Sequence, residues 1–411
     1  MADVPLSRPC PVCQNQHGQR LFAQRFAHFE GALLDGYDVV VCETCGFCFA
    51  DGIPEQDALD VYYRRLSKYE HHQRGGRPSD HDLLRQQRTA EALSPWMPSS
   101  DVRILEVGCS TGALLHVLRE SGFPEVFGWD PSAACAAAAK ELYGLDVRAQ
   151  TLADPGPSAA PFGLVILIGV LEHVRDLSAS LERVRALLSA EGLVYVDVPD
   201  ATRFAQYADA PFQQFSAEHV NFFSEASISN LLSSAGFEAV WCHQGVEALT
   251  ALSPMPNVAG LFRLKTDAVR SRTKDLATRL SLEDYLDKSR SIERDLLAAV
   301  DAVVDRGEPL MVWGVGTLTR RLMATSRLAE ADIRAFVDSN EHYHGKSLAG
   351  IEVIPPSAVR GRTETILVAS VYQVEIERQI RGGLGYTNRI VHLLEQPATD
   401  AKTPNGMSET L

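Results

Sequence analysis

The chain has 411 residues, a formal net charge of −14, 45% hydrophobic residues and eight cysteines. This length predicts two or three domains, because single hydrophobic cores stop growing well below it. The acidic balance argues against a nucleic-acid partner, which would need a basic surface to neutralise phosphates. The longest apolar run, residues 164–171, is too short to span a membrane, and the N-terminal residues carry no signal core. We therefore expect a cytoplasmic protein with reduced cysteines and no membrane partner.

Four cysteines form two C-x2-C pairs near the start of the chain. Cys10 and Cys13 form the first pair, and Cys42 and Cys45 form the second. Each pair makes a tight turn that points two thiolates at one place, and two such turns supply the tetrahedral set that structural Zn²⁺ prefers. The alternative is free thiols or a redox pair. We expect a zinc-binding subdomain and linker over residues 1–75.

The linker before residue 76 contains several tyrosines. Tyr62, Tyr63 and Tyr69 lie in a polar stretch that precedes a helix predicted over residues 82–93. They could cover an active site or pack along a solvated connector, and the sequence leaves both interpretations open.

Residues 101–200 alternate between short apolar strands and amphipathic helices. This pattern predicts an α/β fold with a mostly parallel sheet and helices on both faces. We assign residues 76–255 to this domain and residues 256–307 to a helical connector, with one long helix over 281–304. A second α/β domain is predicted over residues 308–396, and the small polar tail at 397–411 should be disordered.

The stretch "ILEVGCSTGALL" is the most informative motif. A strand ends in Glu106, and a loop from Gly108 to Gly112 then opens a helix. The glycines let the backbone pass close to a ligand at the carboxyl end of a strand, where doubly wound sheets bind cofactors. The loop is neither the dinucleotide G-x-G-x-x-G nor a lysine-containing P-loop. Asp130 ends the next strand, where a carboxylate is placed to accept hydrogen bonds from ribose hydroxyls.

Together, "ILEVGCSTG", "GWDPS" and "VLEHVRD" resemble the class I S-adenosylmethionine (SAM)-dependent methyltransferases. The resemblance implies a Rossmann-like fold that binds SAM. It implies that the methionine and ribose are bordered by Glu106, Gly108, Ser110, Gly112 and Asp130. It implies that the adenine and the remaining side of the pocket are bordered by Gln150, Thr151, Leu152, Gly169, Val170, Leu171 and His173. Cys109 has no neighbouring histidine in the sequence, so we interpret it as a small loop residue.

Over residues 8–395 the chain resembles the three-domain sugar C-methyltransferases, which act on nucleotide-linked keto-sugars. That family carries Tyr-x-Glu-His after the fifth strand of the cofactor domain. Glu218 and His219 match the Glu-His, and Ser216 stands at the tyrosine position. The resemblance implies a nucleotide-sugar as the small-molecule substrate.

Carbon becomes a nucleophile only when a base removes an acidic proton beside a carbonyl and the enolate oxygen is stabilised. Histidine suits this task because its pKa lies near neutral pH. We predict that His219 is the base, that Glu218 assists it, and that His173 donates a hydrogen bond to the carbonyl or enolate oxygen. The alternatives are a structural turn at Glu218-His219 and a helix-capping or pocket-lining role for His173.

The second α/β domain carries weaker signals. Gly314-x-Gly316 could cradle a phosphate or sugar with Arg320 or Arg321 nearby, and His342 and His344 fit a solvated turn better than a metal site. Competing functions are methyl transfer to another carbon, oxygen or nitrogen of a small molecule, a zinc-ribbon RNA methyltransferase, and a non-catalytic cofactor binder.

Overall fold

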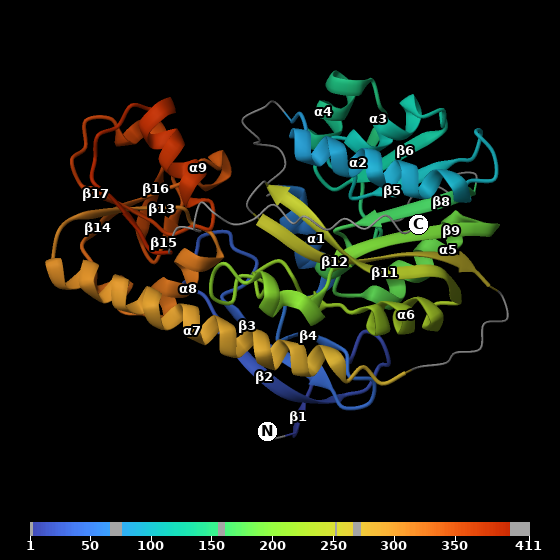
Figure 1. Cartoon of the computed structure of the whole chain (residues 1–411), viewed down its shortest axis with the longest axis horizontal. Helices are drawn as coiled ribbons and strands as arrows, with labels where there is room; N and C mark the ends of the chain where they lie inside the picture. The colour runs from blue at the N-terminus through green and yellow to red at the C-terminus, as the bar shows by residue number, and fades with distance from the viewer. Residues whose placement is uncertain (1–2, 66–75, 155–160, 251–252, 266–272, 395–411) are drawn as a thin grey trace.

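The computed structural model describes residues 3–65, 76–154, 161–250, 253–265 and 273–394. Within these residues the strands form three sheets of five, seven and six strands (Figure 1). Tyr69 and the tail 397–411 lie outside the described residues. None of the helices in the described ranges is long and apolar enough to cross a membrane.

The five-stranded sheet is antiparallel and is built almost entirely from the N-terminal residues. Its order is β1-β2-β3-β4-β10, with β1 Asp3–Pro5, β2 His17–Arg25, β3 Gly36–Cys42, β4 Cys48–Asp51 and β10 Asn221–Phe222. The last strand follows Glu218-His219 directly, so the N-terminal sheet takes in a short piece of chain from far along the sequence. Helix α1 (Gln56–Arg65) follows this sheet.

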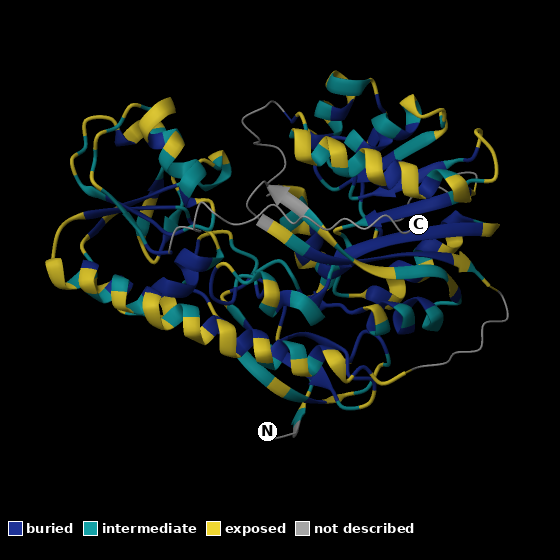
Figure 2. Cartoon of the chain, in the orientation of Figure 1, coloured by how far each residue is buried: buried dark blue, intermediate teal, exposed yellow. Residues whose placement is uncertain are grey.

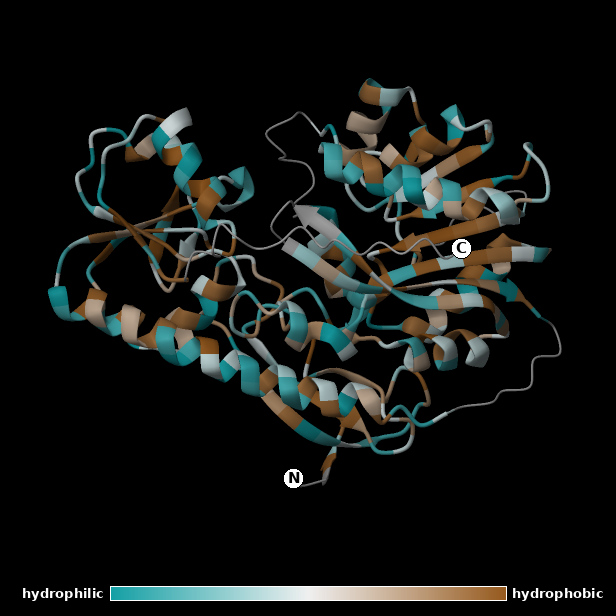
Figure 3. Ribbon diagram, in the orientation of Figure 1, coloured by the Kyte–Doolittle hydropathy of each residue, from teal (hydrophilic) through white to brown (hydrophobic). Residues whose placement is uncertain are grey.

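The seven-stranded sheet confirms the predicted α/β class. Its order is β11-β12-β9-β8-β5-β6-β7, with β11 Phe237–Thr250, β12 Ser253–Leu264, β9 Leu188–Pro199, β8 Phe162–Ile168, β5 Ile104–Val107, β6 Val126–Asp130 and β7 Val147–Ala149. The five strands from β9 to β7 are parallel, and β11 and β12 are antiparallel. The central strands β5 and β8 are mostly hydrophobic (Figure 3), as expected for a sheet covered on both faces, and Glu106 is the charged exception in β5.

Alternate residues of the central strands pack against different layers of helices. Ile104 packs with α2 (Asp80–Leu93) and α3 (Ala113–Glu120), whereas Leu105 packs with α5 (Leu177–Leu187) and α6 (Glu225–Ser234). This period of two puts one apolar row on each face. Helix α4 (Ala133–Tyr143) connects β6 to β7.

Residues 256–264 are strand, so the helical connector predicted over 256–307 begins too early. Pro254 and Pro256 argue against a central strand, because proline cannot donate to a ladder. Both lie before residues 257–263, the segment of β12 that pairs with β9. The donor-free prolines therefore occupy the start of β12, where pairing with β9 has not begun.

The six-stranded sheet lies at the C-terminal end of the chain. Its order is β15-β16-β14-β13-β17-β18, with β15 Ser347–Leu348, β16 Ile351–Ile354, β14 Ile333–Val337, β13 Leu310–Trp313, β17 Thr365–Val368 and β18 Ile390–His392. All pairs except β15 with β16 are parallel. Helices α8 (Thr317–Thr325) and α9 (Gln373–Arg378) flank it, and the π-turn η7 covers Gln379–Gly383.

Helix α7 (Ala277–Arg306) connects the second and third sheets and includes the long helix predicted over 281–304. Its first half packs Leu282 and Tyr285 against the N-terminal sheet, and its second half packs Val300 against the C-terminal one. It ends at Gly307, whose φ of 62° lies in the left-handed region that favours glycine. One side of α7 is exposed along its length (Figure 2).

Short 3₁₀ turns complete the described fold. They are η1 Ser94–Trp96, η2 Leu171–His173, η3 Ala201–Tyr207, η4 Arg327–Glu330, η5 Glu341–Tyr343 and η6 Pro356–Val359.

Candidate functional site

The loop between β5 and α3 is shaped by backbone that only small residues tolerate. Gly108 and Gly112 have φ angles of 73° and 78°, and Ser110 has a φ of 49°. A Cβ on Gly108 would lie 2.8 Å from Cγ2 of Val170, which leaves no room for a side chain there. The loop therefore turns tightly at the carboxyl end of β5, as a cofactor-binding loop requires.

Asp130 ties this loop to the neighbouring strand. Its Oδ2 accepts a hydrogen bond from the backbone N–H of Ser110 at 2.8 Å, and its Oδ1 accepts one from Ser132 N–H at 2.9 Å. A carboxylate has about four acceptor positions. Asp130 can therefore hold the loop and still accept hydrogen bonds from ribose hydroxyls.

Two buried polar atoms beside the loop show that the site fits a cofactor. Glu106 Oε2 and Gln150 Nε2 are shielded from solvent and have no hydrogen-bond partner among the described residues. Burial raises the pKa of Glu106 to about 8, with Asp130 adding to the rise and Arg85 opposing it. Buried polar groups rarely remain unpaired. A ligand with a cationic amine near Glu106 and a hydrogen-bond acceptor near Gln150 would satisfy both, and SAM has both.

The other residues predicted to border the cofactor differ in whether their side chain or their backbone can reach it. Thr151 donates its backbone N–H to Asp154 at 2.8 Å, and Leu152 is nearly buried behind this turn. Gly169 has a φ of 63° at the end of β8. The side chain of Leu171 is completely buried in the core, so only the backbone at this position can face a cofactor.

Cys109 lies inside the loop but is not a reactive thiol. Burial raises its pKa well above the ordinary value, and the nearby Glu106 raises it further. A thiol that stays protonated is a poor nucleophile.

The turn at residues 215–220, called here the Glu-His turn, carries Glu218 and His219. The hydroxyl of Ser216 accepts hydrogen bonds from the backbone N–H groups of Glu218 at 3.3 Å and of His219 at 3.1 Å. Serine at this position thus closes the turn with its own side chain. The turn meets η2 through the N–H of Val220, which donates to the carbonyl of Glu172 at 2.8 Å.

His173 packs directly against the Glu-His turn. Its Nδ1 lies 3.0 Å from the carbonyl of Glu218 and 2.9 Å from the hydroxyl of Tyr63. A carbonyl can only accept, so the hydrogen bond to Glu218 puts the proton on Nδ1. Nε2 then lies on the side of Glu172, whose Oε1 is 3.9 Å away. The rings of His173 and His219 meet edge to face with centroids 5.0 Å apart.

The carboxylate of Glu218 is bound by a tyrosine from α1. Tyr62 donates its hydroxyl proton to Glu218 Oε1 at 3.0 Å. Burial raises the pKa of Tyr62 above its ordinary value, and the charge of Glu218 adds to this, so the hydroxyl stays protonated. Helix α1 therefore supplies two phenol groups to this site: Tyr62 binds the acidic Glu218, and Tyr63 binds the basic His173.

Sequence reasoning did not place Glu172 beside the two histidines. One ligand atom each of Glu172, His173 and His219 lie within 4.8 Å of one another, and the Glu172 side chain is 4% exposed. Its position next to His173 was a signal, because adjacent residues of a 3₁₀ turn after a strand share one end of the sheet. For Tyr62 and Tyr63 the sequence suggests only a possible cover over an active site, and it does not indicate their hydrogen-bond partners.

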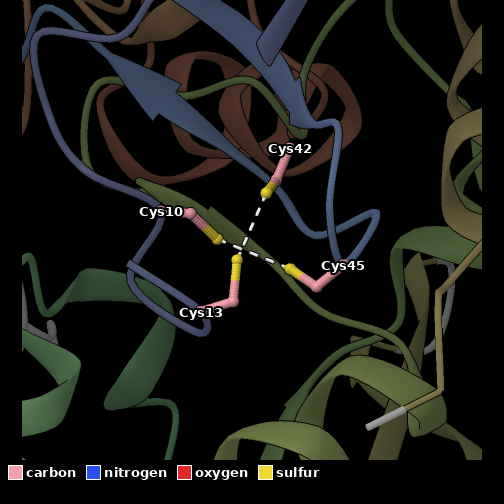
Figure 4. Close-up of side chains that lie close together, drawn as sticks. All are labelled: Cys10, Cys13, Cys42 and Cys45. Carbon is pink, nitrogen blue, oxygen red and sulfur yellow. Dashed lines mark hydrogen bonds between the residues drawn. The ribbon is translucent and has the colours of Figure 1, made fainter. Parts of the chain in front are cut away.

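The four N-terminal cysteines converge on one point (Figure 4). The Sγ atoms of Cys10 and Cys45 are 3.5 Å apart, and those of Cys13 and Cys42 are 3.4 Å apart. Four thiolates about 2.3 Å from a zinc ion would be about 3.8 Å apart, so this set fits tetrahedral coordination. Hydrogen bonds from Cys10 lower the pKa of Cys13 to about 7 and also lower that of Cys42, whereas the pKa values of Cys10 and Cys45 are raised. Two of the four thiols therefore favour the thiolate form that metals bind.

Arg320 and Arg321, which lie near the loop that could cradle a phosphate or sugar, make hydrogen bonds within the protein. Arg320 donates Nη2 to the carbonyl of Leu34 at 2.7 Å, and Arg321 pairs with Glu293 at 2.7 Å. Both guanidinium groups are therefore bound between α8 and other parts of the chain. Arg321 binds Glu293 and Gln24, which does not favour a role for it at a phosphate.

His342 and His344 of the C-terminal domain lie in a half-buried turn. His344 Nε2 lies 2.9 Å from the carbonyl of Asp338, and His342 follows Asn340 in the short turn η5. Among the described residues, neither histidine belongs to a group that could hold a metal ion.

Comparisons with known proteins agree with this reading of the cofactor domain. A family model described as a methyltransferase domain matches residues 69–242. The C-methyltransferase NovU of Streptomyces niveus is 26% identical over 365 residues, which cover 84% of this chain and 83% of NovU. A ubiquinone biosynthesis O-methyltransferase of Rhodopseudomonas palustris is 35% identical over 115 residues. That match covers 27% of this chain and 44% of the relative.

A solved structure of a 1,6-didemethyltoxoflavin N1-methyltransferase from Burkholderia thailandensis has 18% identity and a TM-score of 0.39. It covers 55% of this chain and 97% of that one. The family match, the sequence relatives and the cofactor-shaped loop lead to one conclusion: the protein is a SAM-dependent methyltransferase.

Proposed function

We propose that this enzyme transfers the methyl group of SAM to a carbon next to the carbonyl of a nucleotide-linked keto-sugar. The observation that carries the proposal is a cluster formed by His219, His173, Glu218 and the two tyrosines of α1. It lies at η2, the short turn that follows β8. The cluster starts only a few residues after Gly169, beside the cofactor loop. The 26% identity to a C-methyltransferase over most of both chains supports carbon as the acceptor atom.

Bound SAM supplies an electrophilic methyl group, and the chain must make the acceptor carbon nucleophilic. His219 removes the proton beside the carbonyl, a contribution of about 10²–10⁴-fold for a positioned base. Glu218 is held by Tyr62 at 3.0 Å, which fixes the carboxylate next to the base. The proton of neutral His173 is on Nδ1, so His173 would donate to the enolate oxygen through Nε2 as the imidazolium, whose positive charge stabilises the negative charge that develops there.

The tyrosines of α1 supply the phenol groups that the Glu-His turn itself lacks. Ser216 stands where the resembling family has tyrosine, and Tyr62 and Tyr63 bring phenol groups to Glu218 and His173 from another element. A neutral phenol keeps each acidic or basic partner hydrogen-bonded in a partly buried site. This supports a proton-transfer role for the cluster.

We further propose that SAM contacts Glu106, Gly108, Ser110, Gly112, Asp130, Gln150, Thr151, Leu152 and Gly169, and the backbone of Leu171. Cys10, Cys13, Cys42 and Cys45 would hold one structural zinc ion in an N-terminal subdomain. In this proposal the N-terminal subdomain, the cofactor domain, a connector and the C-terminal α/β domain are separate units of one enzyme.

The test is to supply SAM with a ¹³C-labelled methyl group and a panel of keto-sugar nucleotides, and to record long-range carbon–proton correlations of the product. We expect the label on a ring carbon next to the carbonyl. A label on oxygen or nitrogen, or methylation only of acceptors without a carbonyl, would overturn the proposal.

A further inference from the structure

The start of the Glu-His turn is held by the N-terminal sheet rather than by its own domain. The carbonyl of Phe215 accepts a hydrogen bond from Gln24 Nε2 of β2 at 2.8 Å. The next carbonyl, of Ser216, accepts one from the hydroxyl of Tyr37 of β3 at 2.9 Å. Both donors are buried, so water cannot readily replace them.

The end of the turn is held by the same sheet. The carbonyl of Val220 accepts from the backbone N–H of Ala50 at 2.9 Å and from Arg8 Nη1 at 3.3 Å. Arg8 Nη2 also donates to Asn221 Oδ1 at 3.0 Å, where β10 pairs with β4. The backbone on both sides of His219 is therefore fixed by the N-terminal sheet.

Gln24 also links the turn to the C-terminal domain. Its side chain is completely buried, and its Oε1 accepts a hydrogen bond from Arg321 Nη1 of α8 at 2.7 Å. Arg321 lies over the ring of Phe212, just before the turn, with its guanidinium carbon 4.0 Å from the ring centroid. The two ends of one buried amide thus join α8 to the carbonyl of Phe215.

A buried amide with both ends bonded has one orientation that satisfies both partners, because nitrogen only donates and oxygen only accepts. A displacement of α8 would therefore shift the side chain of Gln24 through Arg321, and Gln24 would in turn shift the carbonyl of Phe215 in the Glu-His turn. A displacement of about 1 Å at a reacting group can cost about 10²-fold in rate.

We propose that Gln24 is a positioning residue that sets the placement of the Glu-His turn and couples it to the C-terminal domain through Arg321. The inference rests on the proposed catalytic role of His219 for its effect on rate. The coupling itself rests on the hydrogen bonds of Gln24 and does not depend on the acceptor.

The test uses Gln24→Glu, with the full-length enzyme carrying its metal. The introduced carboxylate keeps an acceptor for Arg321, and the arginine keeps it ionised. It replaces the Nε2 donor with an oxygen that faces the carbonyl of Phe215. The matched control is Gln19→Glu, because Gln19 lies on the same strand, about 17 Å away, and its Oε1 accepts from Arg279 of α7 at 3.0 Å.

Two readouts are measured: amide hydrogen exchange of residues 215–221 with S-adenosylhomocysteine bound, and the affinity of the free enzyme for S-adenosylhomocysteine. We expect faster exchange in Gln24→Glu alone, with affinity unchanged within about twofold. In turnover we expect kcat to fall roughly 10- to 100-fold, while Gln19→Glu matches the wild type.

Exchange and kcat that match the wild type in a folded Gln24→Glu enzyme would overturn the proposal. If that variant does not fold, Gln24→Met keeps a similar side-chain length and removes both hydrogen bonds, while Arg321 keeps Glu293 as a partner, and exchange in the turn should again be faster. Unchanged exchange in Gln24→Met would then overturn the proposal. If the wild type methylates no keto-sugar nucleotide, the proposed function fails, while the exchange experiment still decides the role of Gln24.

Discussion

Replacing Glu106 with glutamine should make the cofactor-free enzyme more stable at alkaline pH and weaken cofactor binding. Burial raises the pKa of Glu106 from 4.5 to about 8. At about 1.4 kcal/mol for each pH unit, ionising this carboxyl costs up to about 5 kcal/mol more in the folded protein than in the unfolded chain. Between these two pH values the folded protein holds a proton that the unfolded chain releases, so this group lowers stability as pH rises.

Glutamine is neutral in both states and removes this pH dependence. We expect Glu106→Gln to exceed the wild type by about 1–4 kcal/mol near pH 8 and by little near pH 5. Thermal midpoints of both proteins at the two pH values measure the difference. Binding of SAM should weaken by at least about tenfold, because a hydrogen bond to a charged group contributes about 1.5–3 kcal/mol. The reasoning is refuted if the stability gap is the same at both pH values, or if glutamine binds SAM as tightly as glutamate.

Three further predictions concern the metal site and the acceptor side. Cys42→Ser should release about one zinc ion per chain by elemental analysis and unfold the N-terminal sheet, since a small metal site folds with its metal; full metal retention would contradict the four-cysteine site. Tyr63→Phe should lower kcat about 3- to 30-fold and leave SAM affinity unchanged, because it removes one hydrogen bond to His173; equal kcat would exclude a role for this phenol. His219→Ala should keep the wild-type zinc content, whereas loss of a second metal equivalent would make His219 a ligand together with Glu172 and His173.

The sequence predicted the parts of this fold that depend on local pattern. Strand and helix periods gave the α/β class, and the spacing of Cys10, Cys13, Cys42 and Cys45 placed four thiols together. Short motifs of this kind are read reliably because the residues that make a site also make the turn that carries it.

The sequence could not predict contacts between distant segments. Strand β10 joins the N-terminal sheet across more than 160 residues of chain, and Gln24 bonds both Phe215 and Arg321. The helix and strand periodicity of the sequence carries no information about such pairings. The phosphate interpretation of Arg321 stayed open in the sequence for the same reason, since its partner Glu293 is distant along the chain.

The residues of the proposed acceptor site could be named in part from the sequence. A motif indicated Glu218 and His219, and the position after β8 indicated His173. The hydrogen bonds of Tyr62 and Tyr63 arise because α1, before the cofactor domain, packs onto a turn that follows it. Their roles depend on tertiary packing, which the sequence does not display.

The central claim is that His219 removes a proton from carbon beside a carbonyl. The most direct measurement is deuterium uptake at that carbon of a keto-sugar nucleotide in D₂O, with S-adenosylhomocysteine bound so that no methyl transfer occurs. We predict uptake with the wild type and a loss of about 10²-fold or more with His219→Ala. Equal uptake by both proteins would contradict the account.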